Sequence, residues 1–293
     1  MKKAIFKNAV FAATVLLLMA GGVLGCSPKK DGKNLSAKDG VQLVKAVTVG
    51  TLAPFMYVNE KDELTGTDIE IIKEVFKRLP QYKLTIDIAD ALQGVLSGKY
   101  DIAVNNYGYT KVRSESYYYS LPYKTSYNVY IQRPGDKPLT SLKDVSERKY
   151  KTEVEAGGLK ATALEAWNEQ NPNSKINIVY TDVDFMNKLQ HIIDGVSDVA
   201  IDDGPIFDTL LGRFGMTGKL VKNEIDPNTE NFLFPQSNTY FLLTKDEKGR
   251  ALREEINTVL KEMKADGTLA KITKQFLGRD LSPKDEYMQN TVN

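Results

Sequence analysis

The chain has 293 residues, of which 42% are hydrophobic and 26% are charged, a composition typical of globular proteins with enough interior for two lobes. Its 39 lysines and arginines nearly balance its 38 aspartates and glutamates, and no basic stripe is present, so nucleic acid is not expected as a partner. The chain has one cysteine, which excludes a disulfide within it.

The N-terminus has the pattern of a secretion signal. Three lysines precede an apolar run from Ala9 to Ala20, and "GGVLGC" follows this run. The run is too short to span a membrane as a mature helix. "VLGC" resembles a lipobox, in which the cysteine becomes the lipidated N-terminus after cleavage. We therefore expect a signal peptide at 1–25, lipidation at Cys26 and a polar tether at 26–43. The alternative is a signal peptide followed by an incidental cysteine.

The segments that follow alternate between strands and helices. Apolar residues recur at helical spacing in 67–79, Pro80 ends this helix, and Thr67 with Glu70 predicts a capping box at its start. The elements predicted in this first part are strands at 44–51, 82–88 and 100–106 and helices at 67–79 and 91–98. Such alternation predicts a parallel sheet with helices on its faces.

A second copy of this pattern comes next. Its predicted elements are a strand and glycine turn at 153–158, a helix at 159–170, a strand at 176–180, a helix at 182–195 and a strand with a polar end at 198–205. Gly98 and Asp101 in "SGKYDIAV" correspond to Gly195 and Asp198 in "DGVSDVAI". A strand at 239–245 and two further helices close the chain. The sequence therefore predicts two α/β lobes.

Signatures of catalysis and of metal or dinucleotide binding are absent from the sequence. It contains no HExxH, CxxC or GxGxxG pattern and no EF-hand spacing, so we expect neither a metal nor a cofactor. The one histidine, His191, lies near the end of a predicted helix, where an exposed position or an interaction with the helix dipole explains it.

The segment "NNYGYTKVRSESYYYSLPY" sets one arginine among many tyrosines. The Arg113 guanidinium matches a carboxylate with two parallel hydrogen bonds, although a surface pair with Glu115 is equally open. Tyr107 and Tyr109 lie at a strand end and are candidates for ligand contact through their rings. Residues 117–119 are expected to alternate between core and solvent.

Two carboxylates follow a buried strand of the second copy. Asp202 and Asp203 precede Gly204 and Pro205, where an aspartate either receives an ammonium group or caps the next helix. In doubly wound sheets, ligands bind beyond the carboxyl ends of strands. Those ends are residues 105–106 in the first copy and residues 157–158 and 202–203 in the second.

Several stretches together resemble the family 3 extracellular solute-binding proteins, the polar amino-acid receptors of ABC importers. The matching stretches are "GTLAPFMYVNEKDELTGTDIEIIKEVFKRL", "LSGKYDIAVNN", "TKVR", "EAGG", "DVAIDDGP" and "LREEINTVLKEMKADGTLAKITKQFLG". The resemblance implies a two-lobe α/β fold of the periplasmic-binding-protein type II class, each lobe a mostly parallel sheet with flanking helices, joined by two hinge strands. It divides the chain into lobe 1 (44–127 and 239–285), lobe 2 (128–238) and a tail (286–293), with hinges near 126–129 and 238–241.

The resemblance also assigns roles to single residues. Arg113 matches the arginine that clamps the ligand carboxylate, and the Gly108 backbone contacts the same group. Asp203 matches the aspartate that takes the ligand ammonium, which leaves Asp202 a structural role. The further matching positions, which line the cleft or offer backbone N–H groups, are Asn106, Phe55 and Gly158. The loop before "PF" is short and lacks the usual stacking aromatic, so the cleft is expected to be open, with rings supplied by Tyr107 and Tyr109.

The implied function is capture of a polar amino acid and its delivery to an ABC permease and its ATPase. "RLPQYKLTIDI", "AVNNYGYTKVR" and "NTYFLLTKDEKG" resemble the cystine-binding branch, which favours L-cystine or a related amino acid. The expected protein is a monomer, held by lipid on the extracellular face of a bacterial cell membrane. The alternatives are a secreted dehydratase-like enzyme on the same fold and a ligand-sensing lipoprotein.

Overall fold

A six-stranded sheet organises the first lobe in the computed structural model, which describes residues 40–234 and 237–292. The predicted signal peptide and Cys26 lie outside the described residues. The sheet has the order β5-β1-β6-β14-β7, and β8 also pairs with β14. Its strands are β1 (Gln42–Thr48), β5 (Tyr82–Ile88), β6 (Ile102–Tyr107), β7 (Tyr117–Tyr119), β8 (Lys124–Thr125) and β14 (Asn238–Thr244). Strands β5, β1 and β6 are parallel, and β14 runs antiparallel to its neighbours.

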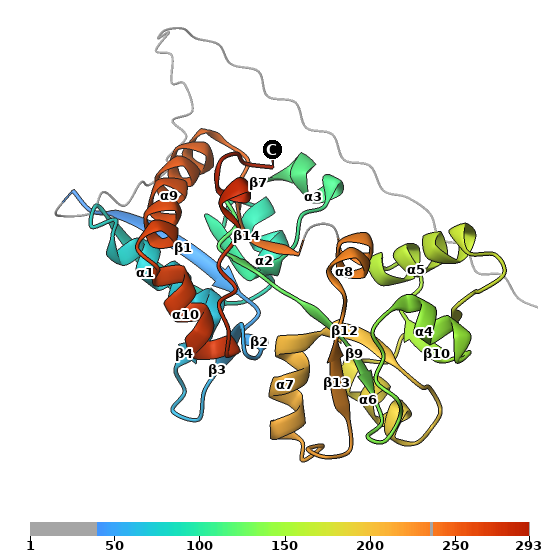
Figure 1. Ribbon diagram of the computed structural model, residues 1–293. Coiled ribbons are helices and arrows are strands. Elements are labelled where there is room, and N and C mark those ends of the chain that lie inside the picture. The colour runs from blue at the N-terminus through green and yellow to red at the C-terminus, as the bar shows by residue number, and fades with distance from the viewer. Residues whose placement is uncertain (1–39, 235–236, 293) are drawn as a thin grey trace, which may run out of the picture. The chain divides into compact units, whose positions relative to one another are not determined.

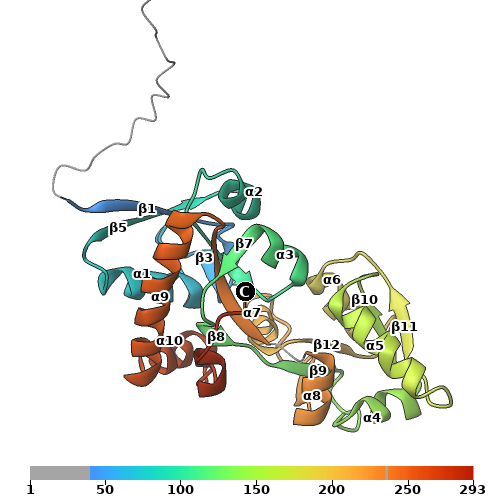
Figure 2. The same ribbon diagram turned by 90° about the horizontal axis from the view of Figure 1, so that it is seen from above.

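Helices cover both faces of this sheet (Figures 1 and 2). One face packs against α1 (Thr67–Lys77) and α9 (Glu247–Ala265), and α10 (Thr268–Leu277) packs on these two helices. Helix α2 (Ala91–Leu96) covers the other face, and α3 (Lys111–Ser116) lies beside β7. Side chains alternate between the two faces with the period of a strand. Phe241 and Leu243 lie in the core with α1 and α9, whereas Tyr240 and Leu242 lie in the core with α2. Residues 240–243 of β14 are therefore buried on both faces of the sheet.

The second lobe consists of the chain between β8 and β14 and has two smaller sheets. Strands β12 (Ala200–Asp203), β9 (Asn128–Gln132) and β13 (Val221–Glu224) form an antiparallel sheet, and β10 (Lys151–Val154) pairs in parallel with β11 (Asn177–Tyr180). The helices of this lobe are α4 (Leu142–Glu147), α5 (Leu159–Gln170), α6 (Phe185–Ile193), α7 (Gly204–Arg213) and α8 (Pro227–Leu233). A parallel bridge between Thr152 and Val199 joins the two sheets.

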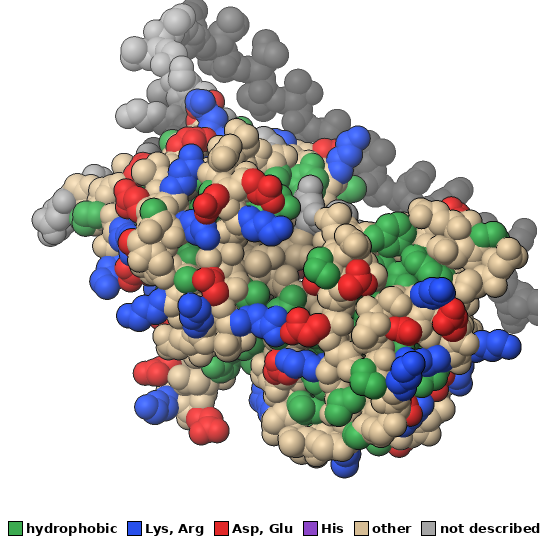
Figure 3. Space-filling model, in the orientation of Figure 1, with side chains coloured by type: hydrophobic (Ala, Val, Ile, Leu, Met, Phe, Trp, Pro, Cys, Tyr) green, Lys and Arg blue, Asp and Glu red, His purple; other side chains and the backbone are tan. Residues whose placement is uncertain are grey.

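Three short strands and a 3₁₀ turn complete the described chain. Strands β2 (Thr51–Leu52), β3 (Met56–Val58) and β4 (Leu64–Thr65) form an antiparallel sheet beside α1, and the 3₁₀ turn spans Asp285–Met288. Among the residues described, no helix is both long and apolar enough to cross a membrane. On the face shown in Figure 3, acidic and basic side chains are interspersed.

The internal repeat predicted from the sequence is confirmed by identical hydrogen bonds. Asp101 accepts a hydrogen bond from the Lys45 N–H at 2.8 Å, and Asp198 accepts one from the Lys151 N–H at 2.9 Å. Gly98 and Gly195, three residues earlier, have φ of 72° and 75°. In both lobes, a glycine with left-handed backbone conformation turns the chain ahead of a buried strand. The aspartate at the start of that strand then bonds to the neighbouring strand, β1 in the first lobe and β10 in the second.

Two details of the fold differ from the sequence predictions. The capping box is wrong: α1 starts at Thr67, its N-cap is Gly66, and no side chain caps it. Carbonyls of the preceding loop satisfy the first donors instead, because the N–H groups of Thr67 and Asp68 donate to the Pro54 and Phe55 carbonyls at 3.0 and 2.9 Å. The six-stranded sheet is also mixed, because β14 runs antiparallel to its partners, and the three-stranded sheet of the second lobe is antiparallel.

Gly66 provides a test of this arrangement. Its φ is +118°, and a Cβ at this position would lie 2.4 Å from the Phe55 carbonyl oxygen. We expect Gly66→Ala to lower the free energy of unfolding by about 3 kcal/mol or more, since strain and a backbone clash add together. Gly98→Ala is the matched control, because φ is +72° but no atom lies within 4 Å. It should cost about 1 kcal/mol by urea denaturation. Equal losses for the two variants would contradict the clash.

Candidate functional site

The carboxyl end of β6 is anchored by its two asparagines. Asn105 Oδ1 accepts hydrogen bonds from Thr48 Oγ1 and from the Val49 N–H, both at 2.8 Å, and so joins the ends of β1 and β6. Asn106 follows with φ of 51°, a left-handed conformation that is uncommon for residues other than glycine. The strand ends one residue later at Tyr107, which pairs with Tyr240 of β14, and the chain then runs through Gly108 to α3, which carries Arg113.

Beneath Asn106 lies a fully buried ion pair that the sequence analysis missed. Asp68, in the first turn of α1, and Lys124, at the start of β8, both have side chains with 0% exposure, and Lys124 Nζ lies 3.4 Å from Asp68 Oδ1. Asp68 Oδ2 accepts hydrogen bonds from the Asn106 N–H at 2.9 Å and from Tyr123 Oη at 2.7 Å. Burial raises the pKa of Asp68 and lowers the pKa of Lys124, and the attraction between the two charges opposes both shifts.

Arg113 is held in place by its own loop. Thr110 caps α3 by accepting a hydrogen bond from the Arg113 N–H at 3.1 Å. The guanidinium Nη1 donates to the Gly108 carbonyl at 3.2 Å, and Cζ lies 5.3 Å from the centre of the Tyr107 ring. The predicted alternative, a pair with Glu115, is not formed, and none of the described carboxylates pairs with Arg113. A partly exposed guanidinium therefore keeps donors that an anion can accept.

The tyrosines around Arg113 are mainly packing residues. Tyr117 and Tyr119 are buried on the α2 face of the sheet, and Tyr118 lies partly buried on the other face beneath the Arg253 guanidinium, 4.6 Å from its ring centre. Alternation of faces is thus confirmed, but Tyr118 does not face open solvent. Tyr109 packs against Tyr119 at 5.3 Å between ring centres. Tyr107 and Tyr109 are both partly buried, so part of each ring remains accessible.

Two of the predicted ligand contacts need correction. The Phe55 ring does not line a surface, because its exposed fraction is 0% and it packs in the core with the Lys124 ammonium 4.2 Å from its centre. The Gly158 N–H is not free, because it donates to the Glu155 carbonyl at 3.1 Å. Gly158 is instead the N-cap of α5, which has no side-chain cap. The first backbone N–H groups of α5 are therefore the donors that this turn presents.

Asp203, the carboxylate predicted to take the ligand ammonium, is also the residue that caps the helix after β12. Its Oδ1 accepts a hydrogen bond from the Ile206 N–H at 2.9 Å, so it caps α7, and its Oδ2 accepts one from Ser126 Oγ at 2.6 Å. Burial raises the pKa of Asp203 above its ordinary value, although these hydrogen bonds and Lys124 oppose the shift. Asp202 forms an ion pair with Lys160 and accepts a hydrogen bond from the Asp203 N–H at 2.8 Å.

One crossing segment holds the candidate residues of both lobes. Lys124 donates a hydrogen bond to Asn106 Oδ1 in the first lobe, and Ser126, two residues later, donates to Asp203 in the second. The return crossing lies alongside, because the Ser126 N–H donates to the Ser237 carbonyl at 2.9 Å. Lys124 and Asp203 also attract each other electrostatically. The sequence offered no signal for Lys124, because a lysine is expected at the surface.

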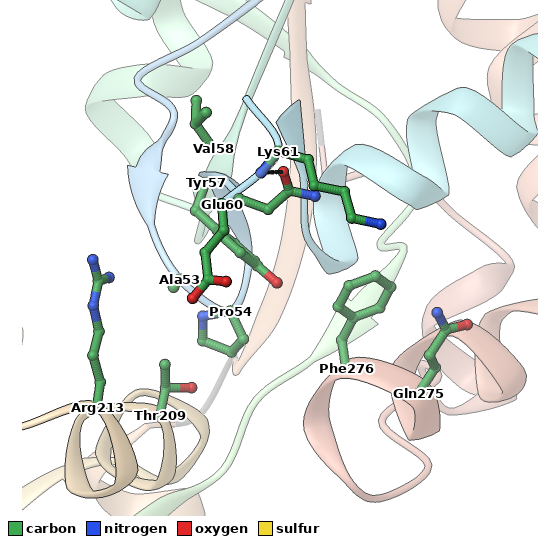
Figure 4. Close-up of a pocket in the computed structure, with 11 residues that line it drawn as sticks. Ala53, Pro54, Tyr57, Val58, Glu60, Lys61, Thr209, Arg213, Gln275 and Phe276 are labelled. Atoms are coloured by element: carbon green, nitrogen blue, oxygen red, sulfur yellow. Dashed lines mark hydrogen bonds between the residues drawn. The ribbon is translucent and has the colours of Figure 1, made fainter. Parts of the chain in front are cut away.

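A cavity of about 790 Å³ lies elsewhere in the described chain (Figure 4). Its walls come from the loop and hairpin at 53–61, from Thr209 and Arg213 of α7 and from Gln275 and Phe276 of α10. In Figure 4 the Tyr57 and Phe276 rings point into this space. The predicted ligand-binding residues of the described chain do not line it. We therefore do not assign the candidate site to this cavity, whatever its volume.

Among the described residues, no group of three or more His, Cys, Asp or Glu side chains is arranged to hold a metal ion. His191 is partly buried at the end of α6, and its Nδ1 lies 2.9 Å from Glu153 Oε1. This contact with a carboxylate, rather than the helix dipole alone, accounts for the histidine.

Residues 44–279 match the bacterial extracellular solute-binding proteins, family 3. The chain belongs to this family. It is 31% identical over 291 residues to the L-cystine-binding protein TcyA of Bacillus subtilis (strain 168), covering 94% of this chain and 99% of that protein. It is 26% identical to TcyK, another L-cystine-binding protein of that organism, over 85% of this chain and 89% of the relative.

A solved structure supports the same assignment of the fold. It comes from a study of glutathione import in Gram-positive bacteria via GshT and the cystine ABC importer TcyBC of Streptococcus mutans. It is 28% identical to this chain, has a TM-score of 0.66, and the match covers 84% of this chain and 99% of that one. The two-lobe class is therefore confirmed. As a member of family 3 the protein is a solute-binding receptor and not an enzyme.

Asp203 is expected to reduce the stability of the folded protein at neutral pH. Because its pKa is raised above 3.8, the folded state holds this proton more tightly than the unfolded state does. Stability is therefore lost as the pH rises from the ordinary range of an aspartate through the raised pKa. Asparagine also caps helices but does not ionise. The free energy of unfolding of Asp203→Asn, relative to that of the wild type, should therefore increase as the pH rises. Urea denaturation at a series of pH values measures this difference.

Asp226 provides a control of opposite sign. It caps α8, and hydrogen bonds from Thr229 and Asn228 lower its pKa. A carboxylate whose pKa is lowered by folding stabilises the folded state at pH values above the ordinary pKa of an aspartate. This stabilisation is lost as the pH falls through the lowered pKa. Asp226→Asn should therefore lose stability relative to the wild type as the pH rises. If Asp203→Asn followed the same trend as Asp226→Asn, the inferred cost of ionising Asp203 would be wrong.

Proposed function

We propose that this protein is a lipid-anchored receptor on the extracellular face of a bacterial cell, which captures a polar amino acid between its lobes and delivers it to an ABC permease. The ligand we propose within this class is L-cystine or a related amino acid. The anchor is the Cys26 lipid predicted from "VLGC". Family membership supports solute binding outside the cytoplasm, and the names of the relatives support an amino-acid ligand.

The observation that carries the proposal is a pair of opposite charges, one in each lobe, with one crossing segment contacting Asn106 near the first and Asp203 itself. Arg113 offers guanidinium donors at the end of β6, and Asp203 offers a carboxylate at the end of β12. An amino acid has one group of each sign on the same carbon, so its carboxylate matches Arg113 and its ammonium matches Asp203. Lys124 and Ser126 are two residues apart in the chain, and they contact Asn106 and Asp203 respectively. A ligand that needs both lobes favours the conformation in which they approach each other.

The choice of ligand rests on the relatives. Two of them are named as L-cystine-binding proteins, and the solved structure comes from work on glutathione and cystine import. Cystine has two amino-acid ends and glutathione has one, with a peptide attached. Isothermal calorimetry with L-cystine, glutathione, L-arginine and L-glutamine separates these classes. Binding of none of these ligands would contradict the proposed function.

Arg113→Lys is expected to weaken ligand binding. Lysine keeps the positive charge but replaces the planar fork with a single ammonium, so one of the two parallel hydrogen bonds to a carboxylate is lost. The loss should be about 1.5–3 kcal/mol in binding free energy, the range for a charged hydrogen bond. Arg250→Lys is the control, since Arg250 forms an exposed pair with Glu247 on α9. Calorimetry that gave equal affinities for Arg113→Lys and the wild type would remove Arg113 from the site.

Ligand binding is expected to close the lobes about the two crossings near 126–129 and 238–241. Closure should lower the radius of gyration measured by small-angle X-ray scattering when a ligand is added. The Arg113→Lys variant at the same ligand concentration serves as the control, because a smaller bound fraction should give a smaller change. Tight binding by calorimetry with an unchanged scattering curve would rule out a closing mechanism for this chain.

A further inference from the structure

Lys124 is a lysine with no access to solvent. Its side chain has 0% exposure, and its ammonium contacts groups from four separate segments. These groups are Asp68 Oδ1 of α1, Asn106 Oδ1 of β6, Thr239 Oγ1 of β14 and the Phe55 ring. Burying a lysine is costly unless its charge is paired and its donors are used. Because this burial costs free energy, stability alone does not explain why a lysine occupies position 124.

The buried ammonium fixes which way the Asn106 amide points. An ammonium group only donates hydrogen bonds, so the amide atom that faces it is the oxygen. Thr239 Oγ1 also lies 3.2 Å from this oxygen. The Asn106 N–H is held from the other side by Asp68 at 2.9 Å. The oxygen and the backbone of Asn106 therefore face inward, and the Nδ2 amide group remains as a donor on the opposite side.

Asn106 is partly exposed and lies two residues before Gly108, whose carbonyl receives the Arg113 guanidinium. Its Nδ2 has no hydrogen-bond partner among the described residues. An amide donor that is fixed in direction, unpaired and two residues before the acceptor of an arginine is suited to a carboxylate, which accepts several hydrogen bonds at once. A freely rotating asparagine would present the oxygen half of the time and would repel the same group.

We propose that Lys124 is a positioning residue for ligand recognition, which keeps the Asn106 amide turned so that Nδ2 donates to the ligand carboxylate beside Arg113. Lys124 itself does not touch the ligand. Asp68 is part of the same device, because it neutralises the ammonium and holds the Asn106 backbone in its left-handed conformation. This inference rests on the proposed function, since it needs a ligand with a carboxylate.

The test removes both buried charges together. Lys124→Met alone leaves Asp68 buried without a counter-charge and is expected to destabilise the fold. The double variant Asp68→Asn/Lys124→Met is therefore the main test, with calorimetry for affinity and thermal unfolding for stability. It should stay folded and bind the best ligand of the amino-acid panel about tenfold more weakly, the scale of one hydrogen bond. Glu70→Gln/Lys73→Met removes an exposed pair from the same helix, 2.9 Å apart, and should leave affinity unchanged.

A double-mutant cycle distinguishes positioning from general structural support. Asn106→Gly deletes the amide, and glycine accepts the positive φ. If Lys124 acts through Asn106, adding Asp68→Asn/Lys124→Met to Asn106→Gly should cost no further affinity. Additive losses would overturn the proposal, and so would an unchanged affinity of the double variant.

A measurement without ligand separates failure of this inference from failure of the proposed function. The Asn106 side-chain amide signal in a ¹⁵N NMR spectrum is identified by its loss in Asn106→Gly. It should shift in Asp68→Asn/Lys124→Met and stay in place in Glu70→Gln/Lys73→Met. If the signal shifts but no ligand binds the wild type, the orienting contact stands and amino-acid binding fails. If the signal does not shift, Lys124 does not orient the amide.

Discussion

The buried ion pair between Asp68 and Lys124 is the interaction on which the candidate site depends. It connects the first turn of α1 to the segment that leaves the first sheet, and both partners contact Asn106. Neither charge is tolerated in the core alone, because the low polarity of the interior penalises an unpaired ion. The position of the crossing segment relative to β6 is thereby fixed, and the loop that carries Arg113 starts from a defined point.

The second lobe meets this crossing through Asp203. That carboxylate caps α7 and accepts a hydrogen bond from Ser126, so its two oxygens are directed by different elements. Burial raises its pKa, which means that the ionised form is disfavoured until another cation approaches. A ligand ammonium is such a cation. A buried carboxylate with a raised pKa is a pattern common at binding sites.

The tyrosine-rich segment contributes mainly to the core of the first lobe. Most of its rings fill the core beside β14, with Tyr119 packing against Tyr240 and Tyr123 against Phe241. Their hydroxyl groups reach polar partners, such as Asp68 for Tyr123, so that large rings are buried without losing hydrogen bonds. Only Tyr107 and Tyr109 remain partly accessible near Arg113. The aromatic residues therefore mainly pack beneath the loop that leads to Arg113.

The sequence by itself determined the order of the main strands and helices, the family, and the pairing of Gly98 and Asp101 with Gly195 and Asp198. These follow from local periodicity and from short motifs, which neighbours in the chain are enough to specify. Which polar groups are buried, and which are presented, was decided by tertiary contacts. The Phe55 ring, predicted to line the cleft, is instead buried in the core. Helix α1 has no capping box, because the carbonyls of residues 54–55 accept hydrogen bonds from its first turn. Lys124 could not be foreseen, since burying an ammonium is favourable only where segments distant in the chain bring a carboxylate and hydrogen-bond acceptors to it.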